Sequence, residues 1–346
     1  MILLVCNDIH TVAKGCKMAY KLHCGDCLDY LPTLADNSVD AIVTDPPYGL
    51  SFMGKAWDRN VPSADVWREA LRVLKPGGYL LAFGGARTYH RLAVNIEDAG
   101  FEIRDQIQWL YGSGKPASTN YLKPASEPVC MARKPPVGTV ADNREAWGTG
   151  SINVDACRVG DEERYNPPAG NKAGGFSLNM SVKGMPKGVA GRVAHGRWPA
   201  NVIHDGSEAV LSAFPVTSSG KMRAGVERSN RGGYTGPMPE TTGAETYGDA
   251  GSAARFFYCA KPSPSEKHAG LDGGKNDHPT VKPIALTRYL CRLVTPAGGI
   301  VLDPFCGSGA IGIGAILEGF GYIGIDLDCG HIKTAAARLA HWSKGA

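Results

Sequence analysis

Short apolar runs alternate with amphipathic segments at both ends of this chain, and this alternation limits the fold more than any other feature. Four apolar runs have the length and composition of buried strands: 39–43, 79–83, 299–302 and 321–325. Five segments carry apolar residues at helical spacing: 64–74, 87–99, 283–294, 310–318 and 332–342. Residues 101–110 alternate as a further strand would. Alternating strands and helices predict an α/β fold with a doubly wound, mostly parallel sheet.

The segment between these two regions has a different composition. Residues 112–255 hold 22 of the 45 glycines, 17 basic and 13 acidic side chains, and little hydrophobic periodicity. Lys and Arg gain free energy by releasing phosphate counterions, so a basic, loop-rich segment suits a polyanion, although a solvated surface insertion has the same composition. We therefore expect residues 1–111 and 256–346 to form two halves of one domain, with 112–255 as an insertion.

Composition also excludes several classes of protein. With 43% hydrophobic and 20% charged residues, the chain is typical of a globular protein. It has no run of about 18 apolar residues and no basic leader, so neither membrane insertion nor secretion is expected. The ten cysteines are then expected to be reduced thiols in a cytoplasmic protein. A zinc site at Cys24-Gly-Asp-Cys27 is conceivable, but no second close pair follows, so no metal is predicted.

A glycine-rich turn follows the predicted strand 299–302. The segment Asp303-Pro-Phe-Cys-Gly-Ser-Gly309 leads directly into a helix, and its glycines let the backbone pass close to a ligand. Asp326 ends the next strand, where a carboxylate accepts from ribose hydroxyls. NAD, or a tight turn with no ligand, would also fit this pattern. Asp303 favours S-adenosylmethionine, because a carboxylate there repels a pyrophosphate and suits a cationic amino acid group.

The second motif is Asp45-Pro-Pro-Tyr48, directly after the predicted strand 39–43. Two successive prolines fix the φ angles of the turn, so the Asp45 carboxylate and the Pro46 carbonyl can be held toward one point beside the ring of Tyr48. That arrangement suits an exocyclic amine. A rigid strand-to-loop turn would explain a lone proline pair, but the flanking Asp and Tyr favour a functional interpretation.

The order of these two motifs resembles that of a known family. Asp45-Pro-Pro-Tyr48 followed much later by Asp303-Pro-Phe-Cys-Gly-Ser-Gly309 is similar to the β-arrangement (DPPY-type) amino-methylating DNA methyltransferases. In that family the catalytic motif precedes the target-recognition region and the cofactor loop comes last. Gly25-Asp26-Cys27 matches the strand-end acid that meets the cofactor's adenine, and His278-Pro-Thr-Val-Lys-Pro283 matches the segment that completes the methionine pocket. Four further segments resemble intermediate motifs or phage-borne and orphan members: 74–78, the region of Trp109, 123–128 and 197–202.

The resemblance implies a fold, an activity and a set of site residues. The fold is a Rossmann-like methyltransferase sheet with a circularly permuted motif order, and 112–255 is its target-recognition region. The activity is site-specific methyl transfer from S-adenosylmethionine to N6 of an adenine flipped out of duplex DNA. The implied catalytic residues are Asp45, Pro46, Pro47 and Tyr48. The implied cofactor-binding residues are Asp26, Thr280, Lys282, Asp303, Pro304, Phe305, Gly307, Ser308, Gly309 and Asp326.

Some alternatives stay open. Asp at the first motif position accompanies adenine in this family and Ser accompanies cytosine, yet a carboxylate accepts from either amino group. An N4-cytosine enzyme of the same fold, one acting on RNA, or a catalytically idle DNA-binding relative would carry similar motifs. Members of the family often pair as homodimers, which is a further expectation here.

Several single residues have two interpretations. Lys282 either contacts the cofactor carboxylate or caps a helix beginning near Pro283, and Trp109 is either a core residue or a base contact. Arg223, Arg228, Arg231 and Tyr234 form either a phosphate-binding loop or a solvated one. The reaction requires no thiol nucleophile, so Cys27 and Cys306 are expected only to line the pocket.

Overall fold

The computed structural model describes residues 3–5, 8–12, 19–51, 54, 58–116, 118–166, 192–220, 248–271, 273–278 and 281–345. Contacts divide the chain into two compact units. The first comprises Met1–Cys157, Ala200–Val210 and Tyr258–Ala346, and the second comprises Arg158–Pro199 and Leu211–Phe257. Residues 112–157 and 200–210 therefore group with the first unit, whereas residues 112–255 were expected to form one insertion.

The described part of the first unit is built on an eleven-stranded sheet. The strands lie in this order: β1 (Leu3–Val5), β2 (Asp8–Val12), β3 (Ala19–Cys24), β15 (Gly321–Asp326), β14 (Ile300–Asp303), β4 (Val39–Thr44), β5 (Leu74–Phe83), β7 (Ser126–Arg133), β6 (Glu102–Leu110), β10 (Val202–His204) and β13 (Tyr258–Cys259). Only β2 and β7 run antiparallel to both of their neighbours in this sheet. The prediction of a mostly parallel α/β sheet is confirmed.

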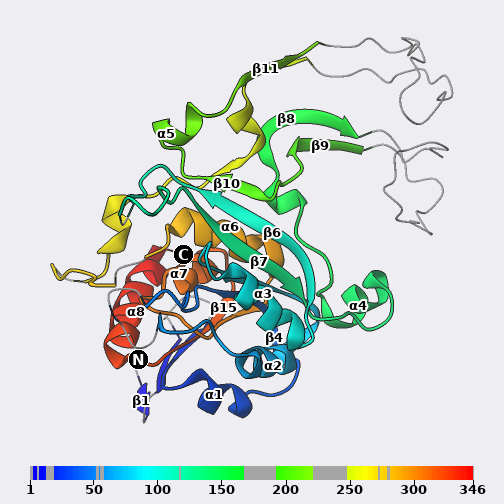
Figure 1. Ribbon diagram of the computed structural model, residues 1–346. Coiled ribbons are helices and arrows are strands. Elements are labelled where there is room, and N and C mark those ends of the chain that lie inside the picture. The colour runs from blue at the N-terminus through cyan, green and yellow to red at the C-terminus, as the bar shows by residue number, and fades with distance from the viewer. Residues whose placement is uncertain are drawn as a thin grey trace. The chain divides into compact units, whose positions relative to one another are not determined.

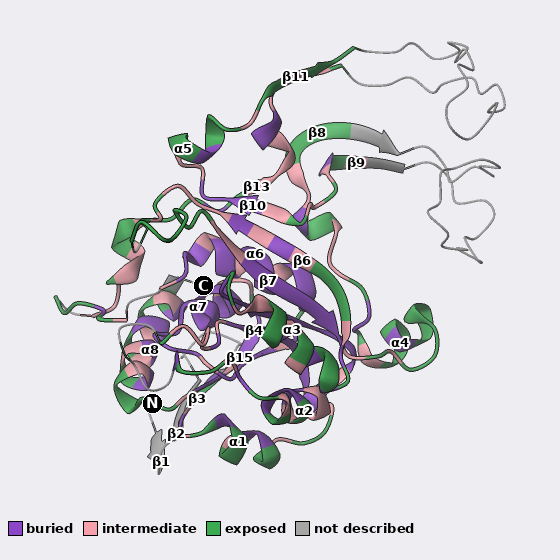
Figure 2. Cartoon of the chain, in the orientation of Figure 1, coloured by how far each residue is buried: buried purple, intermediate pink, exposed green. Residues whose placement is uncertain are grey.

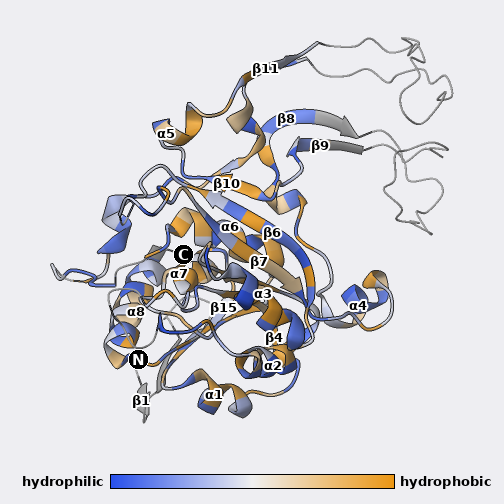
Figure 3. Cartoon of the chain, in the orientation of Figure 1, coloured by the Kyte–Doolittle hydropathy of each residue, from blue (hydrophilic) through white to orange (hydrophobic). Residues whose placement is uncertain are grey.

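Helices cover both faces of this sheet (Figure 1). One face carries α1 (Cys27–Tyr30), α2 (Ala64–Val73) and α3 (Tyr89–Asp98), and the other carries α6 (Ile284–Val294), α7 (Ala310–Leu317) and α8 (Cys329–Trp342). Side chains alternate along a strand, so β4 sends Ala41 and Val43 into the core below α6 and α7 and Ile42 into the core below α2. Figure 2 shows the buried central strands, and Figure 3 shows that α2 and α3 carry both hydrophobic and hydrophilic residues.

The helices and strands expected from periodicity are present, with one informative difference. The strand predicted at 79–83 begins at Leu74, directly where α2 ends. Gly77 has a φ of 72°, and the pairing of β4 with β5 shifts register between Val39 and Ala41. The segment Pro76-Gly-Gly78 is therefore an irregularity within a strand rather than a turn, because Leu74 pairs with Val39 on the sheet.

Strands β14 and β4 mark a switch in the direction of the chain. They are parallel neighbours, but β4 continues to β5 on one side whereas β14 continues to β15 on the other. Ligands of such sheets bind in the crevice outside the carboxyl ends of the strands at this point. The loops that follow β3, β15, β14 and β4 all begin along that edge.

One cysteine pair differs from the expectation of reduced thiols. Cys24, at the end of β3, and Cys329, at the start of α8, form a disulfide with a Cα–Cα distance of 5.2 Å. Cys24 pairs in the sheet with Asp326, and the chain returns to it three residues later, which brings the two cysteines together. Cys24 is therefore not part of a zinc-binding CxxC pair with Cys27.

The second unit contains two antiparallel pairs of strands among its described residues. These are β8 (Val159–Asn166) with β9 (Arg192–Arg197), and β11 (Val216–Ser219) with β12 (Asp249–Ser252). Arg197 binds Glu162 at 2.7 Å and Asp249 at 2.6 Å, and Asp249 also accepts from Arg255. These ion pairs connect its two strand pairs. Arg223, Arg228, Arg231 and Tyr234 lie outside the described residues.

Besides short 3₁₀ helices at Leu31–Thr33, Asp155–Cys157, Ala253–Phe256, Pro264–Lys267 and Ser343–Gly345, the described residues form two more α-helices. They are α4 (Val140–Trp147), which begins at a capping box between Thr139 and Asp142, and α5 (Glu208–Leu211). Among the described helices, none is both long and apolar enough to cross a bilayer.

Candidate active site

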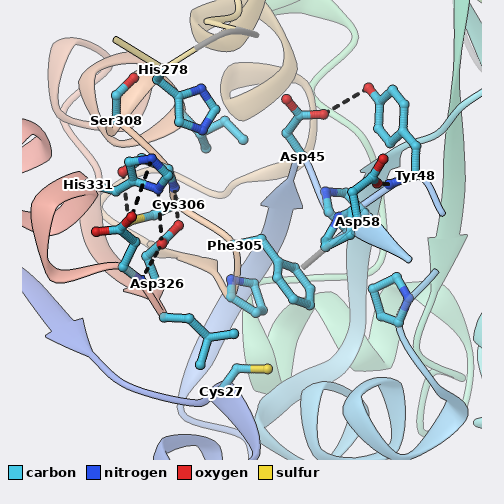
Figure 4. A pocket seen from close by; sticks show the side chains of 18 of the residues that line it. Cys27, Asp45, Tyr48, Asp58, His278, Phe305, Cys306, Ser308, Asp326 and His331 are labelled. Atoms are coloured by element: carbon cyan, nitrogen blue, oxygen red, sulfur yellow. Dashed lines mark hydrogen bonds and ion pairs between the residues drawn. The ribbon is translucent and has the colours of Figure 1, made fainter. Parts of the chain in front are cut away.

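A cavity of about 360 Å³ opens at the carboxyl ends of β3, β15, β14 and β4. Its lining includes the loop segments 25–28, 45–48, 304–308 and 326–328. The sequence-predicted residues that line it are Asp26, Asp45, Pro46, Pro47, Tyr48, Lys282, Pro304, Phe305, Gly307, Ser308 and Asp326. Asp303 and Gly309 are not part of this lining, and Thr280 lies outside the described residues. The aspartate turn (45–48) and the glycine turn (303–309) thus meet at one cavity (Figure 4).

The backbone of the aspartate turn is held by a buried acid that sequence reasoning missed. Asp58 Oδ1 accepts from the amides of Tyr48 at 2.6 Å and Gly49 at 2.9 Å, and its Oδ2 accepts from the amide of Leu50 at 3.2 Å. Thr88 also donates to the Tyr48 carbonyl. Three amides that point at one carboxylate fix the turn. No spacing rule indicated Asp58, because its partners are backbone groups.

The side chains of the turn belong to a closed group that we call the polar ring, formed by Asp45, Tyr48, Glu127 and Lys282. The Tyr48 hydroxyl donates to Asp45 Oδ1 at 2.8 Å (Figure 4) and lies 3.1 Å from Glu127 Oε2. Lys282 Nζ lies 3.0 Å from Asp45 Oδ2 and 2.8 Å from Glu127 Oε2. It also donates to the Tyr48 hydroxyl at 3.0 Å. Glu127 had no predicted role, although it falls within the family-like segment 123–128.

The polar ring keeps a buried lysine charged. Lys282 is only 5% exposed, and burial opposes its charge, but Asp45 and Glu127 outweigh burial and raise the Lys282 pKa. Its ammonium also lies 4.7 Å from the ring centroid of Phe83 and 5.4 Å from that of Tyr48. Burial raises the pKa of Asp45, whereas Lys282 lowers it and Glu127 raises it. The ionisation of Asp45 therefore depends on both charged neighbours.

The glycine turn is supported from below by Asp303. This carboxylate is fully buried and accepts from Thr44 Oγ1 at 2.7 Å, the Tyr322 hydroxyl at 3.1 Å and the Phe305 amide at 3.2 Å. Burial raises the pKa of Asp303 to about 7. All three of these partners belong to the protein, and Asp303 does not line the cavity. Asp303 therefore braces the turn.

A buried arginine, also missed by sequence reasoning, holds the far side of the glycine turn. Arg338 donates to the Ser308 carbonyl at 2.6 Å and hydroxyl at 3.1 Å, and to the Glu266 carbonyl at 3.2 Å. Burial lowers its pKa to about 10. Gly307 adopts a left-handed φ of 49°, and a Cβ there would lie 2.8 Å from His278 Nε2. The turn is therefore closely packed on two sides.

The remaining acids lie at neighbouring strand ends. Asp26 caps α1 by accepting from the Leu28 amide at 2.9 Å, and it is exposed at the cavity. Asp326 accepts from the Gly307 amide at 2.8 Å and lies 3.3 Å from His331 Nδ1. His278 stacks edge-on against His331, and burial lowers its pKa to about 4, so it is neutral at pH 7.

The cavity suits a nucleoside-containing cofactor. Asp26 and Asp326 present acceptors for amino and hydroxyl groups, Phe305 and Leu28 add apolar surface, and Gly307 leaves the backbone uncovered. Burial raises the Cys27 pKa to about 12 and raises that of Cys306 well above its usual range, so both pocket thiols favour the protonated form at neutral pH. Trp109 packs in the core beside Tyr111.

Comparison with known proteins identifies the class. The family model of the N6/N4 methyltransferases, described as DNA methylase, matches residues 39–337. The chain therefore belongs to the N6/N4 DNA methylase family, whose members are S-adenosylmethionine-dependent DNA methyltransferases. The expected class of enzyme and its methyl donor are confirmed. Membership does not fix the methylated base, because the family includes both N6 and N4 enzymes.

Individual relatives are distant. The chain is 23% identical to the type II methyltransferase M.HpaI of Haemophilus parainfluenzae over 330 residues, which cover 93% of this chain and 74% of that protein. It is 26% identical to the type II methyltransferase M2.MboI of Moraxella bovis over 136 residues, which cover 33% of this chain and 50% of that protein. A crystal structure of an M1.HpyAVI–SAM complex aligns over 92% of this chain and 98% of its own, with 18% identity and a TM-score of 0.46.

Proposed function

We propose that this protein is a β-arrangement DNA methyltransferase, similar to phage-borne and orphan members, that methylates N6 of adenine at a specific sequence in duplex DNA. The observation that carries the proposal is the single cavity lined by both the aspartate turn and the glycine turn. An acid beside an aromatic ring suits a base carrying an exocyclic amine. An acid in place of serine at the first position of the turn supports adenine over cytosine.

The aspartate turn binds the target base in this mechanism. An adenine within a duplex cannot reach the cavity, so it is flipped out at a cost of roughly a few kcal/mol. Stacking on the Tyr48 ring offsets about 1–3 kcal/mol of that cost. Asp45 and the Pro46 carbonyl accept hydrogen bonds from the amino group and aim its lone pair, while Pro47 keeps the turn rigid. Positioning of this kind is the main contribution to catalysis.

The cofactor residues have separate roles. S-adenosylmethionine, when bound, supplies an electrophilic methyl group on a sulfonium. Asp26 accepts from the adenine amine and Asp326 from the ribose hydroxyls, as acids at strand ends do in such sheets. The backbone of the glycine turn, from Pro304 to Ser308, forms the floor of the cofactor site, Gly309 follows it as the N-cap of α7, and Asp303 braces the turn. Thr280 and Lys282 belong to the segment that closes the methionine end.

The basic region 112–255 is proposed to contact DNA and select the sequence. Its second-unit part carries Trp198, which is 62% exposed and has the Arg158 guanidinium 5.6 Å from its ring centroid. An aromatic–arginine pair at a surface suits contact with nucleic acid. A cytoplasmic location and a homodimer remain predictions.

Long-read sequencing that detects modified bases tests the proposal. DNA from a host that expresses the wild-type protein should carry N6-methyladenine in one sequence context, and DNA from a host that expresses Asp45→Ala should not. The Asp45→Ala variant should still bind S-adenosylhomocysteine in calorimetry, because Asp45 holds the base rather than the cofactor. Modified cytosine in place of adenine would overturn the choice of base. Methylation by the Asp45→Ala variant would overturn the role of the turn.

A further inference from the structure

The polar ring contains a residue that no motif assigned. We propose that Glu127 and Lys282 are opposed positioning residues that hold the Asp45 carboxylate in a partly shared ion pair, ionised and still able to accept from the target amine. This rests on the proposed function, because it concerns how Asp45 performs it. Glu127 does not line the cavity, so it does not contact a ligand there, and it acts on Asp45 through its charge and through their shared partners Lys282 and Tyr48.

The distances show that the lysine is shared nearly equally. Lys282 Nζ is 3.0 Å from Asp45 and 2.8 Å from Glu127, and the Tyr48 hydroxyl lies 2.8 Å and 3.1 Å from the same two carboxylates. One cation thus serves two anions, which leaves the group with a net charge of −1. A lysine devoted to Asp45 alone would neutralise it more fully and weaken it as an acceptor.

Methyl transfer to an amino group needs an Asp45 carboxylate that is ionised and only partly paired. Methyl transfer forms a carbon–nitrogen bond and breaks the carbon–sulfur bond, whose electron pair stays on sulfur. The amino nitrogen then carries one proton too many, and the Asp45 carboxylate accepts it before releasing it to solvent. An Asp45 that is already protonated cannot do this, and one that is fully paired does it poorly.

The framework holds the pair in place. Glu127 lies on β7, opposite Trp109 on β6, and β7 is bonded on its other side to β5. Lys282 is packed against the Phe83 ring of β5. Neither carboxylate of the ring has another recorded cation partner among the described residues. Strand β7 therefore holds Glu127, and Phe83 of β5 supports the Lys282 side chain beside it.

Other ionisable groups surround Asp45 from neighbouring elements. Asp58 binds the backbone of the same turn, Asp303 lies below it on β14, and Tyr111 lies near Glu127 and Lys282. The Lys282 charge also lowers the pKa of His278. All of these groups are unchanged in the variants below. Differences between the variants therefore measure the effect of Glu127 and Lys282 on Asp45.

Removing the Glu127 charge and removing the Lys282 charge should shift the pKa of Asp45 in opposite directions. Glu127→Gln removes a neighbouring negative charge, so the Asp45 pKa falls, whereas Lys282→Met removes a positive charge, so it rises. The acidic limb of the pH–rate profile should therefore move down in Glu127→Gln and up in Lys282→Met, each by about one pH unit. The double variant removes one charge of each sign, so its limb should return toward the wild-type position.

The experiment measures single-turnover methyl transfer from tritiated S-adenosylmethionine to unmodified genomic duplex DNA between about pH 5.5 and pH 9. A second readout needs no turnover: carbon-13 NMR of Asp-labelled protein follows the Asp45 carboxyl, assigned by comparison with Asp45→Asn. Glu102→Gln is the matched control, because it removes a carboxylate that pairs with Arg133 on the same sheet, away from the ring. Glu127→Gln and Glu102→Gln should bind S-adenosylhomocysteine within about twofold of wild type, which shows that they are folded. Folding of Lys282→Met and of the double variant is checked by circular dichroism, because Lys282 belongs to the segment proposed to close the methionine end of the cofactor site.

The outcomes separate the two proposals. Opposite shifts of the acidic limb in Glu127→Gln and Lys282→Met, with no shift in Glu102→Gln, support the proposal that the two residues position Asp45. Shifts in the same direction, or lower rates with unmoved limbs, would show a merely structural role and overturn it. If Lys282→Met does not fold, the downward shift in Glu127→Gln decides alone. If wild type transfers no methyl group to DNA, the proposed function fails, and the NMR titration still tests whether the pair controls Asp45.

Discussion

The two turns that meet at the cavity are stabilised in different ways. The aspartate turn uses its own charged side chain within the polar ring, where Asp45 shares Lys282 with Glu127. The glycine turn is held by buried ionisable side chains behind the cavity, because Asp303 and Arg338 bind its backbone and neighbouring hydroxyl groups. Charge at the first turn is available to a substrate, whereas charge at the second serves to fix the shape of the backbone.

This contrast follows from what each turn has to do. A turn that accepts from an amine needs an anion whose partners can be shared, and such an anion needs a cation nearby to remain ionised when buried. A turn that lets a cofactor pass close to its backbone needs an unobstructed surface and a rigid support. Asp58 is the exception on the first turn, because it binds three backbone amides as the supports of the second turn do.

Among the residues that support the two turns, Asp58 is expected to have the largest effect when it is removed. Asp58→Ala leaves three amides of residues 48–50 without their acceptor, so the Tyr48 ring and Asp45 lose their fixed positions. We expect single-turnover methyl transfer to fall about 100-fold, as misplacements near 1 Å can cause. Affinity for S-adenosylhomocysteine, measured by calorimetry, should change little because the glycine turn is intact.

Asp58→Asn is the matched control for this prediction. Its side-chain oxygen can still accept from the Tyr48 and Gly49 amides, so it should keep most of the activity lost in Asp58→Ala. Equal losses in the two variants would show that the charge of Asp58 matters rather than its bonds to the backbone. The contrast between a shared anion and a backbone support would then fail at this residue.

The sequence predicted the sheet and the two turns well because both depend on local patterns. Apolar runs mark buried strands, and proline or glycine at fixed spacing marks the turns, so Asp45 to Tyr48 and Gly307 could be found without coordinates. The early start of β5 was missed because Pro-Gly-Gly after a helical pattern ordinarily marks a turn between the helix and the next strand, whereas pairing of Leu74 with Val39 overrides that preference here. The Cys24–Cys329 disulfide was missed because it joins residues 305 apart in the sequence.

The supports of the turns could not be predicted for a similar reason. Asp58, Glu127 and Arg338 act through backbone groups or through side chains far away in the sequence, and no motif records such contacts. Lys282 was found through a resemblance, yet its recorded bonds go to the aspartate turn. Asp303 was expected at the cofactor's amino acid group, and its position below the turn depends on Thr44 and Tyr322.

A change at Asp303 tests the second half of the comparison through pH. Burial raises its pKa to about 7 from an ordinary value of 3.8. As pH rises through this window, Asp303 loses its proton in the unfolded chain but keeps it in the folded one. The folded state then binds more protons, so stability falls as pH rises from about 4 to about 7. Asp303→Asn cannot ionise and should lack this dependence.

Urea unfolding at two pH values measures the effect. The unfolding free energy of wild type relative to Asp303→Asn should fall by roughly 2–4 kcal/mol between about pH 4.5 and pH 7.5. Subtracting the variant removes the contributions of groups that titrate in both proteins. A constant difference between the two proteins would show that Asp303 ionises normally and is not the buried brace described above.

The smallest expected effect concerns Arg338. Arg338→Met removes the donors to the Ser308 and Glu266 carbonyls, so the glycine turn loses part of its support. Affinity for S-adenosylhomocysteine, measured by calorimetry, should fall about tenfold, since a buried carbonyl left without a donor costs about 1–3 kcal/mol. Arg338→Lys keeps the charge, but a single ammonium cannot bridge both carbonyls as a guanidinium does. If Arg338 acts by fixing the backbone, the two variants should therefore lose similar affinity. Full affinity in Arg338→Lys would instead mean that positive charge itself attracts the cofactor, and the glycine turn would then use charge toward its ligand as the aspartate turn does.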